Sequence, residues 1–207
     1  MLPFARRRLT GSMHGMAKAT LSYPELAARI RALPPSCGPV RVVAVDGPSG
    51  AGKSTFARRL AAVLGGAPLV AADDFPVPWD ADPLVWWTRL RRDVLEPLRA
   101  GRPGRLARYD WKRGARGPEE DVPAAPELVL EGVGAGLRDA PLALRIFVDA
   151  PRPLRRDRVL RRDGARFAEA WDAWAEKEAR YFASGAGPAD LRVDGASLTG
   201  EEFGVAG

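Results

Sequence analysis

Short apolar runs alternate along the chain with segments in which apolar residues recur at helical spacing, and this alternation predicts a parallel α/β sheet. Strands are predicted at residues 40–45, 68–71, 127–130, 144–148 and 191–193. Helices are predicted from Ser22 to the residue before Pro34, and at residues 53–64, 83–100, 153–163 and 166–183. Pro97 is expected to kink or break the third of these helices, because proline has no N–H to donate.

The first 20 residues have no such periodicity, and we expect them to be a disordered or non-native tail. Residues 21–207 are then a single domain with its core at residues 40–195. No apolar run reaches the roughly 20 residues that a membrane-spanning helix needs. The segment after Arg6-Arg7-Arg8 is also too polar for a secretory signal.

The composition is that of a folded, charged protein, and its basic character is concentrated at one end. The net charge is +6, but residues 1–40 hold six of the 32 basic residues and only one of the 26 acidic ones. The rest of the chain is nearly neutral. Since no nucleic-acid-binding motif accompanies the charge, we expect neither a nucleic-acid nor a membrane partner.

Several residue types are scarce, and each scarcity excludes a class of site. A single cysteine, Cys37, and a single histidine, His14, exclude disulfide frameworks, multi-cysteine metal sites and His-based zinc clusters. The lone cysteine also suggests a reducing compartment, and we expect a cytoplasmic protein. The absence of asparagine excludes the base-reading motif of GTPases and the catalytic loop of protein kinases.

One motif joins the first strand to the second helix. Residues 47–54 read G-x-x-x-x-G-K-S, a loop whose backbone N–H groups surround phosphates. Its lysine would reach the β- and γ-phosphates, its serine could bind Mg²⁺, and the helix that follows directs its positive end at the anion. The predicted nucleotide-binding residues are Gly47, Pro48, Ser49, Gly50, Ala51, Gly52, Lys53, Ser54 and Thr55.

Carboxylates follow two other strands, and they should lie beside this loop. Asp73 comes after the second strand and Glu131 ends the third. The carboxyl ends of parallel strands converge on one crevice, so both groups should face the phosphates. Phosphoryl transfer needs a base for the acceptor hydroxyl and a carboxylate for Mg²⁺, roles that fit Asp73 and Glu131. The alternatives are a turn or cap role for Asp73 and pairing with an arginine for Glu131.

Two basic segments have open roles. Arg155, Arg158 and Arg162 form one stripe if residues 153–163 are helical, and could neutralise a transferred phosphoryl group or be solvated surface. The segment from Gly101 to Gly117, with Tyr109 within it, could bind the acceptor or cover the sheet.

The motifs resemble those of the uridine kinase branch of the P-loop nucleoside and nucleotide kinases, over about residues 40–195. The matching segments are Val45 to Thr55, Asp73-Asp74-Phe75, Tyr109-Asp110-Trp111 with Arg116, Glu131-Gly132, and Arg158 with Arg162-Asp163. The resemblance implies a P-loop NTPase-type three-layer sandwich with a five-stranded parallel sheet and a short helical lid. It also implies ATP or GTP as donor, Mg²⁺, Asp73 as general base, and Tyr109 and Arg116 at the acceptor.

Two positions depart from that family's pattern, and both lie in its nucleoside pocket. Pro76 replaces a tyrosine and Gly114 replaces a histidine, whereas the phosphotransfer positions match. The leading hypothesis is a kinase that phosphorylates a hydroxyl of a small molecule, most simply a nucleoside. In it, Asp73, Lys53, Arg158 and Arg162 serve catalysis, Ser54 and Glu131 hold the metal, and Asp73, Tyr109 and Arg116 meet the substrate. The alternatives are a sugar, vitamin precursor or nucleoside monophosphate as acceptor, or a non-catalytic nucleotide-binding regulator. A homo-oligomer is compatible with each of these hypotheses.

Overall fold

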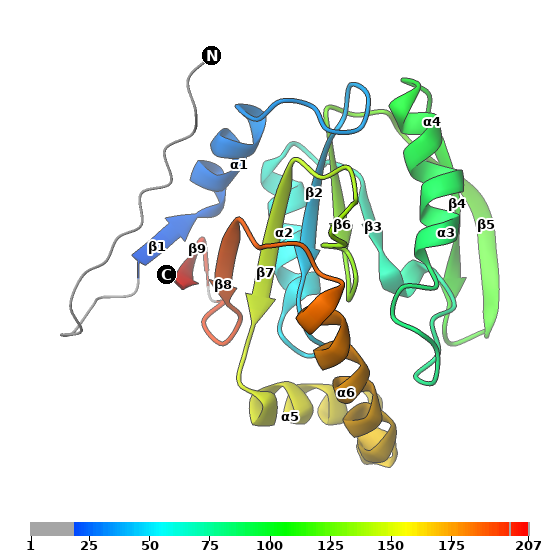
Figure 1. Ribbon diagram of the computed structural model, residues 1–207, viewed down its shortest axis with the longest axis vertical. Helices are drawn as coiled ribbons and strands as arrows, with labels where there is room; N and C mark the ends of the chain where they lie inside the picture. The colour runs from blue at the N-terminus through cyan, green and yellow to red at the C-terminus, as the bar shows by residue number, and fades with distance from the viewer. Residues whose placement is uncertain (1–18, 199, 207) are drawn as a thin grey trace.

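A sheet of seven strands lies at the centre of the structure, in the order β1-β9-β8-β7-β2-β6-β3 (Figure 1). The computed structural model describes residues 19–198 and 200–206. Of the predicted tail, residues 1–18 lie outside the described part, whereas Ala19 and Thr20 belong to β1. The strands of this sheet are β1 (Ala19–Ser22), β2 (Arg41–Asp46), β3 (Leu69–Ala71), β6 (Glu127–Glu131), β7 (Leu144–Asp149), β8 (Leu191–Asp194) and β9 (Glu202–Ala206).

The predicted five parallel strands are confirmed, and two antiparallel strands extend them. β8, β7, β2, β6 and β3 run parallel, while β9 pairs antiparallel with both β8 and β1. The sheet therefore continues past residue 195, the predicted end of the core. Because β2 lies between β6 and β7, the strand order reverses at its carboxyl end, where open α/β sheets bind their ligands.

Helices cover both faces of the sheet and its carboxyl-terminal edge (Figure 1). On one face lie α1 (Tyr23–Arg31) and α2 (Lys53–Val63). On the other lie α3 (Trp87–Arg89), the π-helical η2 (Leu90–Leu95) and α4 (Glu96–Arg99). Near the edge lie η1 (Ala72–Asp74), α5 (Arg152–Asp163), η3 (Ala165–Phe167) and α6 (Ala168–Ser184). Within the described chain, no helix is long and apolar enough to cross a membrane.

Successive side chains of β2 point to opposite faces of the sheet and contribute to two separate apolar cores. Val43 and Val45 pack with α1 and α2, where the rings of Tyr23, Phe56 and Phe203 meet. The residues between them point to the opposite face and pack against the helices α3, η2 and α4. Continuous burial of a strand on both faces is typical of a parallel sheet, which explains the unbroken apolar run in the sequence.

The helix predicted at residues 83–100 begins only at Trp87, and its hydrogen-bonding pattern changes from α-helical to π-helical before Pro97. Residues 90–95 form a π-helical turn, and Pro97 then lies in the first turn of α4. Since Pro97 cannot donate to the carbonyl of residue 93, the local widening accommodates it without ending the helix.

The basic segment after α4 is a β-hairpin, which the sequence pattern did not predict. β4 (Gly104–Asp110) pairs antiparallel with β5 (Ala115–Val122) in a separate two-stranded sheet. Only Leu106 and Val122 of the hairpin join the second apolar core. With so few apolar positions and a proline in β5, the alternation that signals a strand is too weak to read.

A buried carboxylate fastens the elements that meet at the end of β2. Asp46 is 3% exposed. One of its oxygens accepts from the N–H groups of Gly47 (2.8 Å) and Gly134 (3.1 Å). The other accepts from the N–H of Gly136 (2.9 Å) and the hydroxyl of Tyr181 (2.8 Å). Burial raises the pKa of Asp46 above its ordinary value, while these hydrogen bonds hold it down.

Phe203→Ala tests whether β9 belongs to the core. The Phe203 side chain is 1% exposed, and its ring centroid lies 4.9 Å from that of Phe56. Its removal should lower the free energy of unfolding by about 3–5 kcal/mol, measured by urea denaturation. Val85→Ala, at a 47% exposed position, should change it by less than about 0.5 kcal/mol. Equal effects of the two substitutions would show that β9 contributes no packing.

Tyr181→Phe tests the carboxylate network through its pH dependence. Loss of the hydroxyl leaves Asp46 with one donor fewer, which should lower the free energy of unfolding by about 1–3 kcal/mol at pH 7.5. The pKa of Asp46, already raised by burial, should rise further, so the carboxyl protonates as the pH falls and the deficit shrinks. Urea denaturation at about pH 7.5 and 5.5 measures this, since both values lie above the ordinary Asp pKa. The control is Tyr109→Phe, because the hydroxyl of Tyr109 has no partner in the described chain; its stability difference from wild type should not depend on pH. If the loss of stability in Tyr181→Phe is the same at both pH values, the proposed network is contradicted.

Candidate active site

The predicted phosphate loop lies where the strand order reverses, between β2 and α2. Gly47, Gly50 and Gly52 have positive φ angles of 139°, 80° and 103°. A Cβ at Gly47 would lie 2.0 Å from the carbonyl oxygen of Val148, so only glycine fits there. These glycines turn the loop away from the sheet and into the first turn of α2.

The loop presents a row of unused donors. Within the described chain, the amides of Gly50, Gly52, Lys53, Ser54 and Thr55 donate to no protein acceptor, and no side chain caps α2. The Lys53 side chain is buried, and its ammonium donates to the carbonyl of Pro48 at 3.1 Å. Unused amides, a buried ammonium and the positive end of a helix are what a phosphate chain requires.

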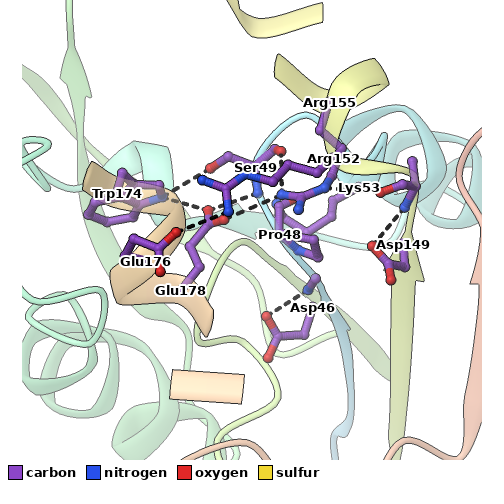
Figure 2. A network of polar contacts seen from close by, with 12 residues as sticks. Asp46, Pro48, Ser49, Lys53, Asp149, Arg152, Arg155, Trp174, Glu176 and Glu178 are labelled. Atoms are coloured by element: carbon purple, nitrogen blue, oxygen red, sulfur yellow. Dashed lines mark hydrogen bonds and ion pairs between the residues drawn. The ribbon is translucent and has the colours of Figure 1, made fainter. Parts of the chain in front are cut away.

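Side chains from α5 and α6 brace the outer side of the loop (Figure 2). The Glu178 carboxylate, 1% exposed, accepts from the Ser49 amide at 2.8 Å and from the Trp174 indole at 2.6 Å. The guanidinium of Arg155 lies 3.7 Å from the same carboxylate. Burial lowers the pKa of Arg155, and Glu178 opposes that shift. Nothing in the sequence marked Trp174 or Glu178 as supports of this loop.

Two of the predicted lid arginines occupy different places. Arg158 donates to the backbone carbonyls of Gly50 (3.2 Å) and Gly195 (3.0 Å), so it holds the loop from outside. Arg162 pairs with Asp163, which is the main cause of its raised pKa, and the charges of Asp73 and Glu131 raise that pKa further. Of the stripe, Arg162 therefore lies nearest the carboxylates.

The predicted carboxylates do converge on the loop. Glu131, 6% exposed at the end of β6, interacts with the Ser54 hydroxyl and with the charges of Lys53 and Asp73. Burial is the main reason that the pKa of Glu131 is raised; Asp73 adds to the shift, whereas Lys53 and Ser54 oppose it. Asp73 lies in η1 after β3, and its exposed carboxylate accepts no hydrogen bond from the described residues.

The acceptor residues predicted from the sequence lie together on the hairpin. Tyr109 and Arg116 are cross-strand partners, and the ring of Trp111 meets that of Tyr109 at 4.9 Å. The Trp111 indole N–H donates to the backbone carbonyl of Asp73 at 2.7 Å. This bond brings the hairpin to the general-base candidate.

The candidate site contains few side chains that could bind a metal ion. Among the described residues, no three acidic, histidine or cysteine side chains form a metal-binding cluster. Ser54 and Glu131 offer a hydroxyl and a carboxylate, and the Ser54 hydroxyl lies near enough to lower the pKa of Glu131. That donor set fits Mg²⁺, which binds through one or two protein oxygens together with phosphate and water.

The sequence matches no family model and no curated protein. The fold resembles two solved structures. One, from Silicibacter sp. TM1040, is provisionally described as a fructose transport system kinase: TM-score 0.54, 20% identity, covering 83% of this chain and 98% of that one. The other, from Bacillus stearothermophilus, is described as a possible uridine kinase: TM-score 0.55, 18% identity, covering 82% and 96%. The chain therefore has the three-layer α/β fold of the P-loop kinases.

Proposed function

We propose that this protein is an ATP- or GTP-dependent, Mg²⁺-dependent kinase that transfers the γ-phosphoryl group to a hydroxyl of a small molecule. The observation that carries the proposal is that a loop of unused amides, a buried lysine and two carboxylates lie together at the carboxyl ends of neighbouring parallel strands. Within that class, a nucleoside is the acceptor that the sequence resemblance favours.

The donor side consists of groups already placed for a triphosphate. The free amides of Gly50, Gly52, Lys53, Ser54 and Thr55 and the ammonium of Lys53 would bind the β- and γ-phosphates. Arg162, beside Asp73 and Glu131, would neutralise charge that develops on the transferred group. Arg158 supports this side through the carbonyl of Gly50, so we assign it a positioning role in the observed arrangement.

The metal would lie between protein and phosphate. Ser54 and Glu131 would hold Mg²⁺, which when bound neutralises phosphate charge and orients the chain.

Asp73 would activate the acceptor. Its exposed carboxylate has no competing donor in the described chain, so it is free to accept a hydroxyl proton. The acceptor oxygen forms its bond to the γ-phosphorus, the bond from that phosphorus to the β–γ bridging oxygen breaks, the proton passes to Asp73, and the nucleoside diphosphate leaves.

The acceptor can be identified by testing a panel of nucleosides, sugars and other small alcohols, with release of ADP as the measurement for each. Stimulation of ADP release by any of them, together with a phosphorylated product, supports the proposal. Slow ATP hydrolysis that no alcohol stimulates would instead favour a nucleotide-binding regulator.

Asp73→Asn separates chemistry from donor binding. Loss of the base should lower kcat by about 10²–10⁴-fold, because the amide cannot take the proton. The dissociation constant for ATP, measured by equilibrium titration, should stay within about threefold of wild type, a change below 1 kcal/mol. Unchanged turnover in this variant would refute the assignment of Asp73.

Lys53→Met is the matched variant on the donor side. Loss of the ammonium should weaken ATP binding by at least about tenfold, since a charge-assisted contact is worth about 1.5–3 kcal/mol. The same titration measures it. Lys53→Met binding ATP as well as Asp73→Asn does would contradict the placement of the triphosphate.

A further inference from the structure

The β4–β5 hairpin is fixed to the acceptor side of the site by two contacts. The Trp111 indole binds the carbonyl of Asp73, and the guanidinium of Arg108 binds the Asp74 carboxylate and the carbonyl of Leu69 at 3.1 Å. The register of the hairpin shifts between Ala107 and Tyr109, where Arg108 lies opposite two residues of β5, Gly117 and Pro118. The hairpin tip therefore lies next to the candidate base.

Two of the predicted acceptor residues share one face of the hairpin tip. Tyr109 and Arg116 are directly opposite in the register, so their side chains lie on the same face of the hairpin. Trp111 touches both the Tyr109 ring and the carbonyl of Asp73. Arg116 consequently shares a face with Tyr109, whose ring contacts the tryptophan that binds the carbonyl of Asp73.

The cations of the hairpin fall into two groups. Near its root, Arg105 pairs with Glu119 and Asp121, and Arg108 pairs with Asp74 and Glu120. At the tip, Lys112, Arg113 and Arg116 are exposed, and no carboxylate of the described chain pairs with any of them. The one acid of the tip, Asp110, accepts from the backbone amides of residues 112 and 113. A net positive charge is thus left on the tip that Trp111 joins to the backbone of Asp73.

We infer that the acceptor carries an anionic group, a carboxylate or a phosphate monoester, in addition to the hydroxyl that is phosphorylated. Arg116 binds that group, with Lys112 and Arg113 adding to the attraction, and the rings of Tyr109 and Trp111 border the body of the acceptor. The planar guanidinium of Arg116 suits the two oxygens of either anion. This inference rests on the proposed function and narrows its acceptor class.

The alternative, a neutral nucleoside, has little in this region to recognise it. A base edge is read by neutral donors and acceptors, yet the chain contains no Asn or Gln. Pro76 and Gly114, close to Asp73 and Arg116 in sequence, have no side-chain hydrogen-bonding groups. Charge is what the tip supplies, so a charged acceptor fits it better.

The test uses pairs of acceptors that differ in one anionic group: glycerol and glycerate, ribose and ribose 5-phosphate, uridine and uridine 5′-monophosphate. ADP release is measured with wild-type protein and with Arg116→Gln. For the pair that is turned over, we expect kcat/KM of the charged member to exceed that of the neutral one by at least about tenfold, or 1.4 kcal/mol. Arg116→Gln should remove most of that ratio and leave the KM for ATP unchanged. The carboxylate and phosphate pairs distinguish the two anions.

Arg105→Gln is the matched control, because Arg105 is an exposed arginine of the same hairpin that is paired at the hairpin root. It should leave the ratio at the wild-type value. Equal turnover of neutral and charged members, or a ratio that Arg116→Gln does not change, would overturn this inference and leave the kinase proposal standing. No stimulation by any member of the panel would overturn both.

Discussion

The buried carboxylate of Asp46 is the constraint on which the rest of the site depends. A charge at this depth is tolerated only where donors surround it, and Asp46 has four, from Gly47, Gly134, Gly136 and Tyr181. They come from the phosphate loop, from the turn after β6 and from α6. One side chain thereby fixes the start of the loop relative to Glu131 and to the helix that braces it. A Cβ at Gly136 would lie 2.8 Å from the carboxylate, so this close approach also dictates a glycine.

The chain contains no Asn or Gln. Hydrogen bonds from arginine side chains to backbone carbonyls hold its loops in place, a role that amide side chains often have in other proteins. Arg155 and Arg158 donate to carbonyls of the phosphate loop, and Arg145 donates to those of Arg138 and Ala140. A high arginine content therefore does not by itself indicate a polyanion partner. The arginines that matter for a ligand are those without a carboxylate or carbonyl partner that also lie near the candidate base, and Arg113 and Arg116 at the hairpin tip are two such residues.

The donor side could be predicted from the sequence because its geometry follows from strand order. Once the strands before Gly47, Asp73 and Glu131 are recognised as parallel, their carboxyl ends must converge, and the structure places them so. The hairpin could not be predicted, because its strands are charged on both faces. Nor could the roles of Tyr181 and Glu178, since contacts across more than a hundred residues leave no local pattern. The spacing of Arg158 left its role open between phosphate binding and solvated surface, and only the fold reveals its carbonyl partners.

This difference between the two sides has a physical consequence for specificity. The donor groups are attached to the central sheet, where a shift of register would misplace a strand's entire apolar face, so they can hardly change. The acceptor groups lie on a hairpin outside that sheet, fixed near Asp73 by Trp111 and Arg108. Substitutions at the exposed tip disturb neither core. The fold thus allows the acceptor to change while the phosphotransfer chemistry stays fixed, which is why the charge of the tip is a better guide to the acceptor than likeness of fold.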